Sequence, residues 1–334
     1  FESAPSAWLH LDEREEYEPI LGSAPQPPGP LPDLAPDPQR LREALTLLGE
    51  AGARRRLGAY DVYAAELPAA LRQPLETILV ESEPIWAGRY GVTPIGEPAA
   101  ALVVFADAES YRAFQDRSAD LAGLTSSAHV AEGLVALQRG ENPETALLHE
   151  LSHLFARRAI GPLLPPWLGE GLAEVFADFG WAAARGIERG EWLSRFRRRD
   201  ARRIELEGPL ASLRLVLDAA SAGHLPGLQQ LVALDWDEFV RSERRALHYA
   251  QSGWFVHFLL EAQGGRHGDD FRRFLQAVAG GGTPDGEGLS AALATDWPTL
   301  EATFRAWLVA EGVRTGVRPV TTESDPQGGS VDEP

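Results

Sequence analysis

The chain has 334 residues, a net charge of −18 and no cysteine. The missing cysteines exclude disulfides, thiolate metal ligands and a cysteine nucleophile. Because the protein is so acidic, it is a poor binder of phosphate backbones, and we expect no nucleic-acid partner. The longest apolar run, residues 99–106, is far too short to cross a bilayer. We therefore expect no membrane-spanning segment in this chain.

Both ends of the chain have the composition of disordered segments. Residues 1–40 hold nine prolines and a cluster of acids, which predicts a disordered, proline-rich tether. The composition of residues 321–334 predicts a disordered acidic tail. The folded domain is therefore expected over 41–320. A tether of this kind suggests attachment to an upstream signal or lipid anchor. We therefore expect an extracytoplasmic protein, secreted or tethered to a membrane.

The first part of the folded region, about 41–140, should contain the strands. Apolar spacing predicts a helix over 41–57, a short strand over 59–66 and a helix over 67–90. Pro74 and Pro84 should break or kink the last of these, because proline lacks the backbone N–H that a helix interior uses.

A continuous apolar stretch over 100–106 predicts a buried strand, and Asp107 is a suitable N-cap for a helix that continues through Phe114. A second strand is predicted over 132–138. It is either the sheet edge along which an extended peptide lies or an ordinary inner strand. Residues 141–320 show helical patterns almost throughout, so we predict an α+β fold, a small mixed sheet followed by a mainly helical part.

The first helix after the sheet has well-marked ends. Asn142 is a good N-cap, Pro143 suits the first helical position, and Gly161 is a candidate for the left-handed residue that follows the helix. These signals place the sequence HELSH, residues 149–153, inside one helix.

His149 and His153 lie one turn apart on this helix, so both imidazoles can reach one tetrahedral Zn²⁺ ion. Glu150 projects beside them, where it can act as a base on a water molecule without being a ligand. The alternative is two helical histidines at this spacing by chance. A zinc enzyme also needs a third protein ligand.

Glu170 is the candidate for that third ligand, seventeen residues after His153. The intervening turn lets a second helix bring its carboxylate back to the same ion. Gly169 and Gly171 flank it and would allow two helices to approach closely. Glu174, one turn further, is placed to accept a hydrogen bond from the outer nitrogen of a ligand histidine. The alternative is an ordinary solvated acidic helix.

HELSH followed by WLGEGLAE, residues 167–174, resembles the gluzincin zinc peptidases, which include thermolysin and the membrane-alanyl-type aminopeptidases. The chain is more closely similar to the uncharacterised bacterial peptidase MA-like families. There, sequences of the type VVFAD and YRAFQ precede the zinc motif, and one like LHYAQSGWFVHFLLE follows it. The resemblance covers roughly 60–310. It implies a zincin fold with thermolysin-like architecture and one Zn²⁺ cofactor.

By the same resemblance His149, His153 and Glu170 would be the metal ligands, Glu150 the general base, and Glu174 the acid that supports a ligand histidine. The spacing from the second histidine to the glutamate is slightly shorter than in the aminopeptidases. The G-x-M-E-N pattern of those enzymes is absent. Nothing in the sequence therefore favours removal of single N-terminal residues.

Amide hydrolysis also needs a donor for the oxyanion that forms on the attacked carbonyl. In gluzincins this is often a tyrosine or histidine on a helix after the glutamate helix. Tyr249 and His248 are the candidates, and Tyr249 is preferred because the family-like YAQS pattern begins with it. The alternative is that either side chain simply packs between helices.

Together these residues predict a zinc-dependent peptidase acting on a peptide or protein substrate through a glutamate-assisted, zinc-activated water. One alternative is a catalytically inactive zincin-like module for binding or assembly at the cell surface. The presence of Glu150 counts against it, because a binding module has no need of a base. A hydrolase of non-peptide amides, such as cell-wall crosslinks, would use the same site.

Overall fold

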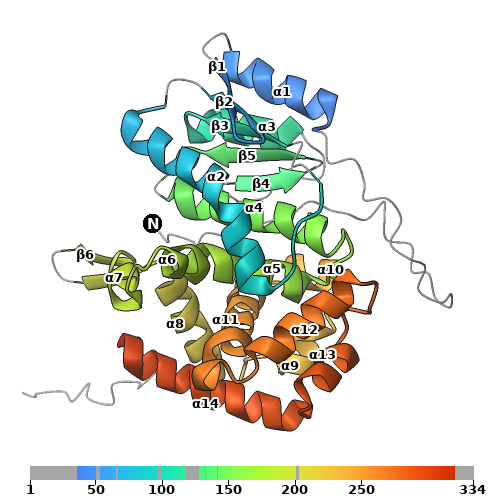
Figure 1. The fold of residues 1–334 in the computed structure, drawn as a ribbon. Coiled ribbons are helices and arrows are strands. Elements are labelled where there is room, and N and C mark those ends of the chain that lie inside the picture. The colour runs from blue at the N-terminus through green and yellow to red at the C-terminus, as the bar shows by residue number, and fades with distance from the viewer. Residues whose placement is uncertain are drawn as a thin grey trace, which may run out of the picture.

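The computed structural model describes residues 36–49, 53–64, 67–96, 100–117, 128–131, 133–140, 142–200 and 203–319. Most of the predicted tether and all of the predicted tail lie outside these ranges. Within them the fold is α+β, with a small mixed sheet followed by helices, as the sequence predicts (Figure 1). No helix of the described ranges combines the length and the apolar character needed to cross a membrane.

The sheet-containing part comprises α1 (Pro38–Leu48), β1 (Ala53–Leu57), β2 (Tyr60–Ala64), α2 (Ala69–Tyr90), β3 (Ala101–Phe105), α3 (Ala108–Arg117), β4 (Ala128–Ala131) and β5 (Leu134–Gln138). The strand order is β1-β2-β3-β5-β4. β2, β3 and β5 run parallel, while β1 and β4 lie antiparallel to their neighbours at the two edges.

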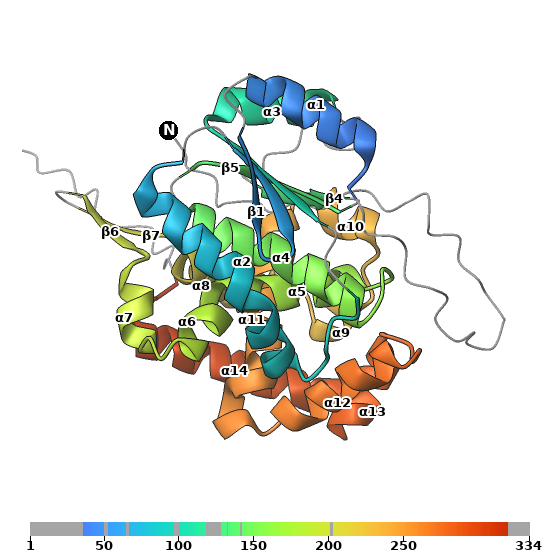
Figure 2. The ribbon, with the colours of Figure 1, turned by 45° about the horizontal axis from the view of Figure 1, so that its top comes forward.

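The sheet is covered on both faces. Figure 2 shows α1 and α3 on one face and α2 with the next helix, α4 (Pro143–Ala159), on the other. β3 is buried at every position because it lies between these layers, which is why its sequence is continuously apolar. Asp107 caps α3 as predicted, since its carboxylate accepts from the backbone N–H of Ser110 at 2.8 Å.

Two expectations for this part are wrong. Ala53–Leu57 forms strand β1, not the end of a helix, because it pairs with β2 across a tight turn in which Gly58 has a φ of 56°. Helix α2 continues through Pro74 and Pro84, so the break that was one of the two expected effects of these prolines does not occur. Its inner face packs into the core from Leu75 to Tyr90, so tertiary packing stabilises the helix despite the two missing hydrogen bonds.

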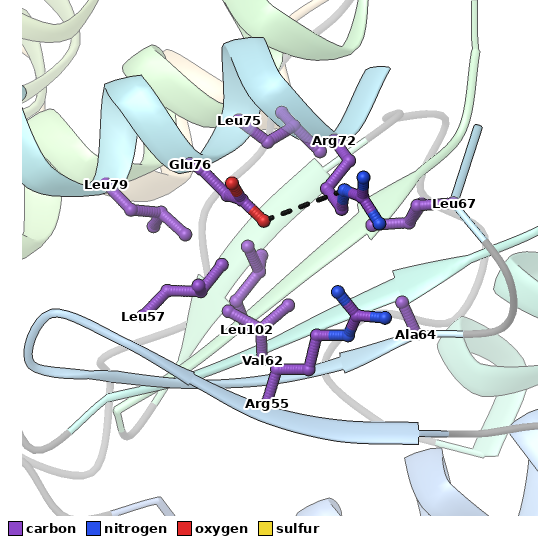
Figure 3. A pocket seen from close by; sticks show the side chains of 10 residues that line it. All are labelled: Arg55, Leu57, Val62, Ala64, Leu67, Arg72, Leu75, Glu76, Leu79 and Leu102. Carbon is purple, nitrogen blue, oxygen red and sulfur yellow. Dashed lines mark ion pairs between the residues drawn. The ribbon is translucent and has the colours of Figure 1, made fainter. Parts of the chain in front are cut away.

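The predicted strand over 132–138 is β5, and it lies inside the sheet. The reading of it as the peptide-binding edge is therefore wrong, and the inner-strand reading is correct. The edge of the sheet on this side is β4. This strand has only four residues, which is too short for its sequence to show the alternation of apolar and polar side chains that marks a strand. The opposite edge, the β1–β2 hairpin, and helix α2 together line a cavity of about 150 Å³ (Figure 3).

The helical part begins with α4 and continues with α5 (Pro166–Val175), the π-helical turn η3 (Phe176–Gly180), α6 (Trp181–Ala184), α7 (Arg189–Ser194), α8 (Gly208–Ser221), α9 (Leu228–Val232), α10 (Trp236–Val240), α11 (Arg245–Gly265), α12 (Gly268–Ala279), α13 (Gly286–Leu293) and α14 (Trp297–Thr315). One hairpin, β6 (Arg197–Asp200) with β7 (Arg203–Leu206), interrupts the helices. Helix α11 is buried on all sides and packs directly against α5.

Candidate metal centre

Helix α4, which carries HELSH, is buried around almost its entire circumference. It begins after Asn142 with Pro143 in its first turn, as predicted, although the Asn142 side chain makes no capping hydrogen bond. Gly161 follows the helix with a φ of 129°. Ser152, inside the motif, accepts a hydrogen bond of 2.8 Å from the indole N–H of Trp86 on α2. This contact anchors the polar motif between the sheet layer and the helical part.

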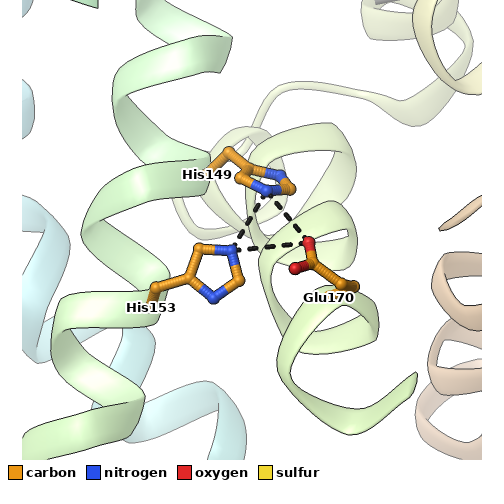
Figure 4. Close-up of side chains that lie close together, drawn as sticks. All are labelled: His149, His153 and Glu170. Atoms are coloured by element: carbon orange, nitrogen blue, oxygen red, sulfur yellow. Dashed lines mark hydrogen bonds and ion pairs between the residues drawn. The ribbon is translucent and has the colours of Figure 1, made fainter. Parts of the chain in front are cut away.

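The three predicted ligands meet at one point (Figure 4). The Nε2 atoms of His149 and His153 lie 3.1 Å apart, and Oε2 of Glu170 on α5 lies 3.4 Å and 3.6 Å from them. A tetrahedral ion with bonds of about 2.0–2.2 Å holds its donors about 3.3–3.6 Å apart. The two distances to Glu170 fall in this range and the distance between the histidines is slightly shorter, so the triangle is close to the size that a tetrahedral metal site requires.

The site is built in a dry environment. His149 and Glu170 have no exposed surface, and His153 retains 8% of its own. Burial, aided by the charge of Arg157, lowers the pKa of His153 to about 3. The ring is therefore neutral near pH 7, which is the protonation state that binds a metal ion. A divalent cation would supply the positive charge that a buried carboxylate beside the neutral His153 ring needs.

Glu150 is fully buried beside the ligands. Burial raises the pKa of its carboxyl group well above the usual value, and the negative charge of Glu170 raises it further. The backbone N–H of Val130, on the edge strand β4, favours the charged form and opposes this shift. A carboxyl group whose environment favours the protonated form is suited to accepting a proton.

Glu174 lies behind the first ligand histidine. Its Oε1 atom is 3.7 Å from Nδ1 of His149, on the side of the ring away from the triangle. Asp178, one turn further in η3, was not singled out from the sequence. Burial raises the pKa of Asp178 to about 8 and that of Glu174 well above its usual value, with the neighbouring Asp178 charge as a further cause for Glu174.

Tyr249 lies close to the centre. Its hydroxyl is buried and makes no hydrogen bond with the residues that the structure describes. Burial raises the pKa of this phenol, and the charges of Glu170, Glu174 and Glu150 raise it further. The phenol therefore stays protonated, and the three carboxyl groups of the centre are near enough to influence its pKa.

The side chain of His248 points away from the metal centre. Its Nδ1 atom lies 3.1 Å from the backbone carbonyl of Phe239, and its ring lines a surface depression beside α10 with Asp237 and Arg241. Adjacent residues on a helix project about 100° apart, so only one of the pair can face the metal centre. The two sequence candidates for the oxyanion donor are thus separated by geometry.

Two glycines set the distance between α5 and α11. A Cβ atom added to Gly171 would lie 2.5 Å from Val256 and 2.8 Å from the carbonyl oxygen of Ser252. A Cβ atom on Gly253 would lie 2.9 Å from the Cβ of Glu174. The predicted close approach at Gly171 therefore occurs, but against α11. Gly169 shows no such contact, since its nearest neighbour would be 3.9 Å away.

No protein-family model matches the chain, and no curated protein matches it in sequence.

Proposed function

We propose that the protein is a zinc-dependent peptidase of the gluzincin type, with thermolysin-like architecture and a site similar to that of the peptidase MA-like families. The observation that carries this proposal is the triangle of donor atoms from His149, His153 and Glu170. Two neutral imidazoles and one carboxylate form a donor set of catalytic zinc sites, which keep one coordination position open. The burial of all three supports a preorganised centre.

The presence of Glu150 favours a catalytic role for this site over a role in metal storage. A Zn²⁺ ion at this site would acidify a water molecule and polarise a substrate carbonyl. Glu150 would take the proton from the attacking water and pass it to the leaving amine. Its buried carboxyl, adjacent to the triangle yet outside it, has the position and the raised pKa that this role needs.

Tyr249 is our proposed donor to the developing oxyanion, in preference to His248. Its protonated phenol lies beside the carboxyl groups of the centre, and its O–H has no hydrogen-bond partner among the described residues. A donor already fixed in a dry site stabilises the developing charge without reorganisation.

Strand β4 supports a peptide as the substrate. It is an edge strand of the described sheet, and it packs against α4 with Val130 beside Glu150. An extended peptide that pairs with β4 would gain affinity from backbone hydrogen bonds with little sequence selectivity. The peptide-binding edge that we propose is thus β4, the neighbour of the strand β5 that the sequence suggested.

One observation favours the alternative, a catalytically inactive zincin-like module. Glu150 and Glu170 have no exposed surface, so the centre offers a substrate little access in this conformation. Such a centre could also serve as a structural metal site that stabilises the contact between α4 and α5.

A comparison of wild type with one variant, Glu150→Gln, distinguishes the peptidase from the structural module. Wild type and Glu150→Gln are loaded with zinc, assayed for zinc, iron, manganese and copper by mass spectrometry, and tested on a broad peptide library. The peptidase proposal expects about one zinc per chain in both proteins and hydrolysis that is slower in the variant than in wild type by a factor of about 10²–10⁴. Zinc in both proteins without hydrolysis by either would support the structural module.

A further inference from the structure

A second feature of the molecule lies at the far edge of the sheet. The cavity of about 150 Å³ between α2 and the β1–β2 hairpin has walls that are mostly aliphatic. They are formed by Leu57, Val62, Ala64, Leu67, Leu75, Leu79 and Leu102. An apolar cavity of this size accepts a ligand of about six carbon atoms, as the benzene-binding cavity of an engineered lysozyme shows.

The rim of this cavity carries an arginine that has no partner among the described residues. Strand β1 reads ARRRL, and alternation along a strand sends Arg54 and Arg56 to the face opposite from Arg55. Arg54 and Arg56 both pair with Asp61, at 2.9 Å and 3.6 Å. Arg55 stands opposite Val62 in the hairpin register and lines the cavity. Its guanidinium makes no ion pair or hydrogen bond with any residue that the structure describes.

A second arginine lies across the opening. Arg72 of α2 lines the same cavity, and in Figure 3 its guanidinium and that of Arg55 point toward the end where Leu67 and Ala64 lie. Arg72 has a long ion pair of 3.8 Å with Glu76, which also lines the cavity. Arg55, Arg72 and Glu76 together carry one net positive charge at the rim of the cavity. The chain as a whole has a net charge of −18.

We propose that this cavity binds a small aliphatic carboxylate, with its tail among the leucines and its carboxylate between Arg55 and Arg72. The guanidinium fork matches a carboxylate in geometry. One net positive charge balances a monoanion, whereas a phosphate dianion would bring excess negative charge toward Glu76. The site lies apart from the metal centre, and the inference does not depend on the proposed peptidase activity.

The first test is a chain-length series. Straight-chain carboxylates from butanoate to decanoate are titrated into the full chain by calorimetry. Each added methylene that enters the cavity should tighten the dissociation constant about fourfold, since its burial is worth about 0.8 kcal/mol. The gain should stop at a tail of about six to seven carbons, when the cavity is full. An affinity that does not depend on chain length would overturn the proposal, as would hexanol binding as tightly as hexanoate.

Two substitutions on strand β1 test whether the carboxylate group of the ligand binds at Arg55. Arg55→Gln should weaken hexanoate binding at least tenfold, because it removes a charge-assisted hydrogen bond. Arg54→Gln is the matched control: it removes the same charge one residue away, on the opposite face, and should leave the dissociation constant within twofold. Both positions are exposed, so both variants should fold. Equal weakening by the two would show a general charge effect and contradict the assigned site.

Discussion

Nδ1 of His149 lies 3.7 Å from Oε1 of Glu174, while Nε2 of the same ring lies 3.4 Å from Oε2 of Glu170. The imidazole therefore lies between two carboxyl groups, one on the side of the triangle and one behind it. A carboxylate behind a ligand histidine fixes its orientation and raises its basicity. The two glutamates sit one turn apart on α5, so a single helix supplies both.

Glu174→Gln should weaken zinc binding about 10- to 100-fold, because the amide keeps the size of the side chain but replaces the carboxyl group that faces Nδ1 of His149. Competition with a chromophoric chelator measures the affinity. Glu191→Gln, an exposed glutamate on α7, is the control and should bind zinc as wild type does. Unchanged affinity in Glu174→Gln would mean that this carboxyl group does not support the ligand.

Tyr249→Phe should lower kcat by a factor of about 10²–10³ while KM and zinc content stay close to wild type, because it removes one oxyanion donor and nothing else. His248→Asn is the comparison, since its ring contacts the Phe239 carbonyl away from the centre. Steady-state kinetics on one peptide should show it within a few-fold of wild type. The opposite ranking of the two variants would reassign the donor.

The sequence was sufficient to predict that His149, His153 and Glu170 come together, because their spacing follows from helix geometry. His149 and His153 share a face at any i, i+4 spacing, and the turn before α5 brings Glu170 back. Strand β3 and the boundaries of α4 were predictable for similar local reasons, a continuous apolar run and strong capping residues.

The features that the sequence did not reveal depend on contacts between distant segments. Strand β1 forms because Ala53–Leu57 pairs with β2, although its arginines carry no strand pattern. The role of Gly253 appears only when α11 meets Glu174. Asp178 belongs to a π-helical turn, which shifts the side-chain positions relative to an α-helix and has no sequence signature of its own.

Gly171→Ala should destabilise the protein by about 1–3 kcal/mol, because the new methyl group would overlap Val256 and the Ser252 carbonyl on α11. Gly169→Ala, two residues earlier on the same helix, meets nothing closer than 3.9 Å. That change should stabilise the protein by up to about 1 kcal/mol through helix propensity. Urea unfolding of the zinc-free proteins compares them, and equal effects would refute the close approach of α5 and α11.

His257 should make the protein less stable in acid. Its ring is buried and stacks on Phe179 at 4.1 Å. Burial lowers its pKa well below the usual value, with the charges of Arg189, Arg89 and Arg314 as further causes. Below about pH 6.5, His257 takes up a proton in the unfolded chain but stays neutral in the folded protein. The free energy of unfolding therefore falls as the pH decreases, by up to about 1.4 kcal/mol per pH unit.

His257→Phe removes this proton uptake and keeps an aromatic ring in the stack. With chelator present, so that metal release does not contribute, its free energy of unfolding should depend less steeply on pH between 6.5 and 5 than that of wild type. Urea titrations at a series of pH values measure both slopes. Parallel slopes would show that His257 takes up its proton equally in the folded and unfolded states.

The central claim is that one metal ion sits among His149, His153 and Glu170, and anomalous diffraction at the zinc edge tests it most directly. Crystals of the protein loaded with one equivalent of zinc should show a single strong anomalous peak about 2.0–2.2 Å from both Nε2 atoms and from a carboxylate oxygen of Glu170. A peak elsewhere, or zinc scattered among surface carboxylates with none inside the triangle, would contradict the account.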